Sequence, residues 1–215
     1  TIGSESLLHR SIHALNQLGI HDIAVVIGFQ ANKMRKNRFN SVHWVVNPFF
    51  QHCNNLGSLY CAKDFVGNSP FLYLHSDVIF PFEILNRSLA SMATIPDDII
   101  ELVTDFCATD EEMMKVKVDK EMYLLESSKT IPLHEAAGEW TGIALVHDSP
   151  TLFNTCEEIL LAGDLNCYDT RAFNVLASRG ARISCVSTHG LPWLEIDTPS
   201  DLERGVFLRD DFYVF

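Results

Sequence analysis

The sequence has no long apolar run, no paired cysteines and little positive charge. No stretch approaches the roughly 20 apolar residues with which a helix crosses a bilayer. Residues 1–10 lack the basic-then-apolar pattern of a signal peptide. The six cysteines include no C-x-x-C pair and have no histidines at zinc-binding spacing, so we expect reduced thiols. These absences predict a cytoplasmic protein with no membrane partner.

Negative charge outweighs positive charge, with 16 Lys and Arg residues against 28 Asp and Glu residues and a formal net charge of -12. Nucleic acids and anionic membrane surfaces select basic patches, so this balance argues against both as main partners. A small anionic ligand is still compatible, because carboxylates can hold a divalent cation that in turn binds phosphates. The sequence leaves the oligomeric state open, a homo-oligomer included.

Short apolar runs rich in β-branched residues alternate with segments of helical periodicity. Strands are expected at 23–27, 42–46, 70–74, 99–103, 141–146 and 182–186. Helices are expected at 57–66, 81–91, 150–161 and 168–178. The alternation favours a mainly parallel sheet with right-handed crossovers, and a hairpin within 114–125 makes the sheet mixed. With no repeat or linker, we expect a single-domain, Rossmann-like three-layer α/β/α fold over residues 1–215.

Two acidic residues follow predicted strands, where ligands of such sheets collect. Asp77 lies just after the strand at 70–74 and could either hold Mg²⁺ or cap a turn. Residues 198–201 form a capping-box-like helix start, which leaves Asp197 without a structural role. Two such carboxylates meeting at one edge of the sheet would make a magnesium site with open positions for substrate phosphates.

Polar side chains occur at two further places. The segment 54–59 offers asparagine donors and acceptors suited to a base or sugar, and Gly57 permits close approach of a ligand, although a capped helix explains the same residues. Glu139 and Trp140 open a strand and could bind an ammonium group, or Trp140 could be interfacial. The histidines, His75 among them, show no ligand spacing, and we expect them at surface or core positions.

Taken in order, these segments resemble the nucleotidyltransferase superfamily, and within it the cytidylyltransferases that act on choline phosphate or 2-aminoethylphosphonate. The most specific motif is the closing W-x-E-I-D-T-P-x-D-L-E-R at 193–204. The other matching segments are 47–48, 54–59, Asp77, 110–116 and 138–143. The ordered set covers nearly the whole chain.

The resemblance implies a role for each matching position. Asp77 and Asp197 would hold Mg²⁺ between the phosphates of nucleotide and acceptor, and Lys129 would meet the acceptor phosphate. Asn55, Gly57 and Ser58 would lie beside the base. Glu139 and Trp140 would face the amine end of the acceptor.

The implied reaction transfers CMP from CTP to phosphocholine or 2-aminoethylphosphonate and releases pyrophosphate. The alternatives are a sugar-phosphate nucleotidyltransferase that uses UTP or another triphosphate, and a non-catalytic regulatory member of the same fold. Family members open with a strand and a G-x-G-x-R loop that cradles the triphosphate, whereas this sequence begins at Thr1, without an initiator Met. We therefore expect a truncated sequence, which on its own binds nucleotide weakly and turns over slowly.

Overall fold

The computed structural model describes residues 5–36, 39, 42–91 and 97–207. Its helices are α1 (Leu7–Gln17), α2 (Ala31–Met34), α3 (Asn55–Cys61), α4 (Lys63–Val66), α5 (Phe82–Ser91), α6 (Ser149–Leu161), α7 (Thr170–Ser178) and α8 (Pro199–Phe207). Its strands are β1 (Ile23–Ile27), β2 (Val42–Val46), β3 (Phe71–Leu74), β4 (Val78–Ile79), β5 (Ile100–Asp105), β6 (Lys115–Val118), β7 (Leu124–Ser128), β8 (Gly138–Val146), β9 (Ile183–Ser187) and β10 (Leu194–Glu195).

The predicted α/β class with a mixed sheet is confirmed, and each expected strand is present to within a few residues. The helix expected at 57–66 differs in two ways. It starts earlier, because the Asn54 side chain caps it by accepting from the Asn55 backbone N–H at 2.8 Å. It is also divided at Ala62 into α3 and α4.

Strand β8 is the centre of the main sheet, and all nine of its residues are buried. It pairs with β5 along one edge, and with β3 and β6 along the other. β3, β5 and β9 share one direction, but β8 runs against them between β3 and β5. Neighbouring strands of this sheet are therefore mostly antiparallel, which differs from the mainly parallel arrangement that strand and helix alternation predicts.

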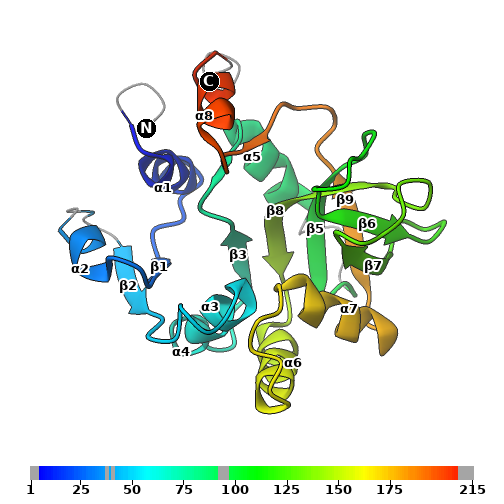
Figure 1. Cartoon of the computed structure of the whole chain (residues 1–215), viewed down its shortest axis with the longest axis horizontal. Helices are drawn as coiled ribbons and strands as arrows, with labels where there is room; N and C mark the ends of the chain where they lie inside the picture. Colours follow the sequence, from blue (N-terminus) through cyan, green and yellow to red (C-terminus); the bar gives the residue numbers. More distant parts are fainter. Residues whose placement is uncertain (1–4, 37–38, 40–41, 92–96, 208–215) are drawn as a thin grey trace.

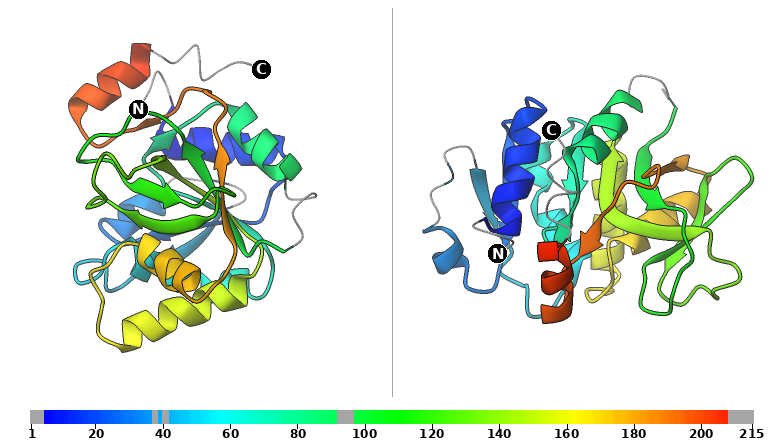
Figure 2. Two further views of the ribbon diagram at one scale, coloured as in Figure 1. Left: turned by 90° about the vertical axis from the view of Figure 1, so that its right-hand side faces the viewer. Right: turned by 90° about the horizontal axis from the view of Figure 1, so that it is seen from above.

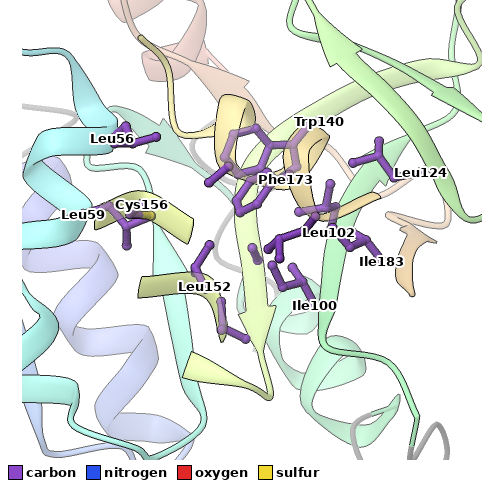
Figure 3. Packing of buried hydrophobic residues seen from close by; sticks show 14 of the residues in the cluster. Leu56, Leu59, Ile100, Leu102, Leu124, Trp140, Leu152, Cys156, Phe173 and Ile183 are labelled. Carbon is purple, nitrogen blue, oxygen red and sulfur yellow. The ribbon is translucent and has the colours of Figure 1, made fainter. Parts of the chain in front are cut away.

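Helices cover both faces of this sheet, as the three-layer prediction requires. Side chains alternate along β5, so Leu102 faces α6 and α7 while Val103 faces α1 and α5. α1 and α5 accordingly lie on one side of the strands and α3, α6 and α7 on the other (Figure 1, Figure 2). Figure 3 shows the core on the side of α3, α6 and α7, in which Phe173 and Trp140 pack beside leucines of α3 and α6.

β1 and β2 form a separate parallel two-stranded sheet. Ile23 of β1 packs with Ile12 and Leu15 of α1 in the core on the α1 and α5 side, which fixes this sheet to the rest of the molecule. Among the described residues, no helix is long and apolar enough to cross a membrane.

Candidate active site

The segment after β3 and the segment around β10 lie side by side. β10 pairs antiparallel with β4, with Leu194 opposite Ile79 and Glu195 opposite Val78. Next to this pair, the Ile196 backbone N–H donates to the Asp77 carbonyl oxygen at 2.9 Å. The two acidic segments that the sequence singled out are therefore neighbours, although more than half the chain separates them.

Three side chains converge at this contact. One potential ligand atom from each of His75, Asp77 and Glu195 lies within 4.8 Å of the other two. The Oδ1 atom of Asp77 is buried and has no hydrogen-bond partner among the residues that the structure describes. Leaving a carboxylate oxygen buried without a partner is costly, and a cation at this point would satisfy it. The residues present therefore fit a divalent cation.

Asp197, the expected second ligand, lies outside this group of three. It is exposed, two residues beyond Glu195. Glu195 is also exposed, but partial burial of its carboxylate, followed by the nearby carboxylates of Asp197 and Asp77, raises its pKa. Glu195 is thus the residue of this segment whose carboxylate comes within reach of Asp77, and Asp197 adds charge beside it. Sequence reasoning passed over Glu195, although residues two apart in an extended segment point to the same face.

His75 was expected at a surface or core position, and instead it belongs to the convergent group. Its Nε2 atom lies 2.8 Å from Oδ2 of Asp169, whose side chain is fully buried. Burial opposes protonation of the ring. The hydrogen bond and charge of Asp169, together with the charges of Asp77 and Glu195, outweigh it and raise the pKa of His75.

Asp169 connects this group to two helices. Its carboxylate also accepts from the Tyr73 hydroxyl at 2.8 Å and from the Thr170 backbone N–H at 2.8 Å, at the start of α7. The Asp169 backbone N–H donates to Oδ1 of Asn55 at 2.8 Å. Asn55, expected beside a nucleotide base, therefore has a structural hydrogen bond in this state, which ties α3 to α7.

The other two residues expected beside the base also have neighbours within the protein. A Cβ atom on Gly57 would lie 2.6 Å from Sγ of Cys53, so the glycine provides space for that side chain. Ser58 Oγ accepts from Nδ2 of Asn47 at 3.1 Å. A cavity of about 560 Å³ is lined by Asn47, Cys53, Gly57 and Tyr60, among others, so this region does border an open space.

Glu139 and Trp140 do not share one pocket, because adjacent residues of a strand point to opposite faces. Trp140 is 3% exposed, packs in the core against Phe173, and donates from Nε1 to the Ile143 carbonyl oxygen at 2.9 Å. The structure therefore corrects the expectation that its ring lines an acceptor pocket.

Glu139 lies on the side of the acidic group. Burial, then the carboxylates of Glu195, Asp110 and Asp105, raise its pKa to about 8, while Lys129 opposes the shift. Glu139 is 7% exposed. A carboxyl whose ionisation is opposed by burial and by acidic neighbours would gain from a cationic ligand, because a positive charge stabilises its ionised form.

Lys129 lines a cavity of about 380 Å³ together with Glu111, Glu112 and Lys115. Lys115 is 1% exposed, and its ammonium donates to the carbonyl oxygens of Asp110 at 3.0 Å and Glu111 at 3.1 Å. Sequence reasoning did not assign Lys115 a role. In the structure it holds the acidic loop that forms one wall of this cavity.

The fold is that of nucleotide-transferring enzymes. The chain superposes on the inositol-1-phosphate CTP transferase from T. maritima with a TM-score of 0.81 and 17% identity, covering 97% of this chain and 83% of that chain. It superposes on a putative glucose-1-phosphate thymidylyltransferase from Bacillus anthracis with a TM-score of 0.78 and 20% identity, covering 100% of this chain and 87% of that chain. For the CTP:phosphocholine cytidylyltransferase from Streptococcus pneumoniae the TM-score is 0.74 and the identity 15%, with 97% of this chain and 87% of that chain covered.

The sequence profile of the MobA-like NTP transferase domain matches residues 1–115. The chain belongs to this family, which confirms the resemblance to nucleotidyltransferases drawn from its motifs. Comparison with curated proteins finds no match.

Proposed function

We propose that this protein transfers a nucleotidyl group, CMP from CTP, to a small acceptor that carries a phosphate or phosphonate group, such as phosphocholine or 2-aminoethylphosphonate. Two observations carry the proposal, both at the contact between β4 and β10: Oδ1 of Asp77 is buried without a partner among the described residues, and ligand atoms of Asp77 and Glu195 lie within 4.8 Å of each other. A buried carboxylate oxygen of this kind, beside an imidazole and a second carboxylate, supports a cation site in a chain of the NTP transferase family.

Asp77, Asp197 and Glu195 would hold Mg²⁺. When bound, the ion neutralises charge on the nucleotide and acceptor phosphates. Partial burial and the neighbouring carboxylates of Asp197 and Asp77 raise the pKa of Glu195, and this clustering supports the assignment because a bound cation would relieve the repulsion among them. Asp197 is exposed two residues from Glu195, so its carboxylate could approach an ion that Asp77 would contact.

Lys129 and Glu139 would position the acceptor by its two ends. Lys129 borders the cavity beside the acidic loop and would bind the phosphate or phosphonate group. Glu139, buried beside Glu195 and Asp105, would bind a primary or quaternary ammonium group, which such a carboxylate favours. An acceptor with an anionic end and a cationic end matches this pair of residues better than a sugar phosphate, which has no cationic end to place beside Glu139.

The reaction needs little acid–base chemistry. An anionic oxygen of the acceptor attacks the α-phosphorus of the nucleotide, a new P–O bond forms, and the P–O bond to pyrophosphate breaks. Since the attacking oxygen is already ionised, no strong general base is required, and the protein contributes mainly by positioning and charge stabilisation. Asn55, Gly57 and Ser58 would lie beside the base, where the cavity bordered by Gly57 offers space.

The test is pyrophosphate release by the full-length protein with Mg²⁺. The four nucleoside triphosphates are each combined with phosphocholine, 2-aminoethylphosphonate and glucose 1-phosphate. We expect release with CTP and one of the first two acceptors, and its loss in Asp77→Asn and in Asp197→Asn. Asp22→Asn, at an exposed site before β1, is the matched control. Near-normal release in both variants would remove the mechanism.

Two other outcomes would overturn parts of the proposal. Release with UTP or another triphosphate and glucose 1-phosphate would replace the proposed substrates by a sugar-phosphate pair. Binding of nucleotide without release from any pair would favour a regulatory member of the fold. In an active protein, Lys129→Ala should raise the KM for the acceptor at least tenfold and leave that for the nucleotide nearly unchanged.

A further inference from the structure

An imidazole lies among the oxygen ligands of the proposed cation site. A ligand atom of His75 is within 4.8 Å of one from Asp77 and one from Glu195. Mg²⁺ prefers an all-oxygen, near-octahedral set of ligands that includes several waters. Imidazole nitrogen binds first-row transition metals more strongly than it binds Mg²⁺, and the affinity rises from Mn²⁺ to Co²⁺. The ligand set therefore contains one member that Mg²⁺ does not require.

We propose that His75 is a direct ligand of this site, oriented by Asp169, and that the site binds a divalent transition metal such as Co²⁺ or Zn²⁺ more tightly than Mg²⁺. This inference deepens the proposed function, because it assigns the chemistry of the cation in the same site. It can nevertheless be tested by binding alone, without substrate.

The hydrogen bond to Asp169 determines which ring nitrogen can bind a metal. The carboxylate oxygen only accepts, so Nε2, at 2.8 Å, carries the proton of the neutral ring. The lone pair of the neutral ring is then on Nδ1. A carboxylate that accepts from one nitrogen of a histidine while the other binds the metal is the arrangement that orients metal-binding histidines in proteins.

Asp169 is itself held in place, so it can act as a fixed anchor. The Tyr73 hydroxyl donates to the same Oδ2 atom, and the Thr170 backbone N–H donates to Oδ1. The Asp169 side chain is fully buried. Movement of the carboxylate would break several hydrogen bonds in a buried environment, which makes the orientation of His75 a stable feature of the free protein.

The backbone of β8 leaves room for the ring. Gly142 has a φ of +77°, and a Cβ atom there would lie 2.8 Å from Cγ and 2.9 Å from Nδ1 of His75. The His75 backbone N–H donates to the Gly142 carbonyl oxygen at 2.9 Å. The Trp140 ring meets the imidazole edge to face, with centroids 4.9 Å apart. These contacts place the imidazole in one position before any metal arrives.

The experiment titrates metal-free full-length protein with Co²⁺, follows the visible absorption of the bound ion, and then competes it with Mg²⁺ and Zn²⁺. We expect Co²⁺ to bind about 100-fold tighter than Mg²⁺. His75→Gln should weaken Co²⁺ binding by about 10- to 100-fold, and Asp169→Asn should act in the same direction. The affinity for Mg²⁺ should change less than threefold in His75→Gln. His134→Gln, at an exposed histidine, is the matched control.

Equal binding of Co²⁺ by the wild type and a folded His75→Gln variant, checked by circular dichroism, would overturn the inference. So would a wild type that prefers Mg²⁺. The decision rests on His75→Gln, so misfolding of Asp169→Asn would not affect it. A protein that binds Co²⁺ through His75 but releases no pyrophosphate would support this inference and contradict the proposed function. Conversely, the protein could release pyrophosphate in a manner that depends on Asp77, while His75→Gln leaves Co²⁺ binding unchanged. That result would support the proposed function and contradict this inference.

Discussion

The side-chain oxygen of Asn55 accepts a 2.8 Å hydrogen bond from the backbone N–H of Asp169, so the first residue of α3 is fastened to the residue that precedes α7. Asp169 is the buried carboxylate that holds His75. The contact therefore links the packing of two helices on one face of the sheet to the residue that orients a proposed metal ligand.

Asn55→Ala should destabilise the free protein by about 1–3 kcal/mol, because it leaves a backbone N–H without its partner. Urea denaturation without nucleotide measures this change apart from any effect on binding. Asn86→Ala, at an exposed position of α5, should change the free energy of unfolding by less than about 0.5 kcal/mol. Equal stability of the two variants would contradict the structural role of Asn55.

Gly57→Ala should lower stability even though alanine favours a helix by about 1 kcal/mol. The new Cβ would lie 2.6 Å from Sγ and 2.8 Å from Cβ of Cys53, and overpacking of this kind costs about 1–3 kcal/mol. Thermal unfolding of a double-mutant cycle with Cys53→Ala checks the cause. The double variant should recover part of the loss, whereas strictly additive effects would show that Cys53 is not the obstacle.

The stability of the metal-free protein should fall as the pH rises from about 5 to 8, because of Glu139. Its pKa is about 8 in the folded protein, against an ordinary value of 4.5. Between these values the folded state holds a proton that the unfolded state has lost, so raising the pH favours unfolding. The contribution of Glu139 to the stability of the protein is therefore greatest below pH 4.5, and it is lost above about pH 8.

Glu139→Gln should flatten this dependence, measured by urea denaturation in EDTA at intervals between pH 5 and pH 8. Glu126→Gln, at an exposed position of β7, serves as the control and should keep the wild-type slope. A slope that is unchanged in Glu139→Gln would mean that its carboxyl titrates normally.

Lys115→Met should loosen the acidic loop beside Lys129. The buried ammonium donates to two carbonyl oxygens of this loop, and methionine keeps the apolar stem without the donors. Hydrogen exchange at residues 110–112 should accelerate at least several-fold, since fewer hydrogen bonds then oppose local opening. Lys120→Met, at an exposed lysine, should leave exchange there unchanged.

Local patterns were sufficient to predict most elements of the fold, but not the pairing of its strands. The β-branched run of β1 and the helical periodicity of α6 depend on neighbours in sequence, and both lie where expected. The insertion of β8 between β3 and β5 depends on contacts between distant segments, which periodicity does not encode. The two-residue strand β4 is too short to produce a pattern at all.

The candidate site was predictable where a motif carried it. Asp77 and the 193–204 segment could be singled out from sequence, and the structure brings them together. His75 could not, because its significance comes from Asp169, which lies 94 positions further along the sequence. Trp140 was misplaced because its polar neighbour Glu139 suggested a binding wall, whereas strand alternation sends the indole into the core.

The short pairing of β4 with β10 also affects how the protein is made. A ribosome synthesises the segment that holds His75 and Asp77 before the segment that holds Glu195, which lies more than half of this sequence further along. Asp77 and His75 are therefore synthesised before Glu195 is available to them. Nascent chains interrupted before β10 should lack one of the three groups of the proposed cation site, so under this proposal tight metal binding should follow the synthesis of β10.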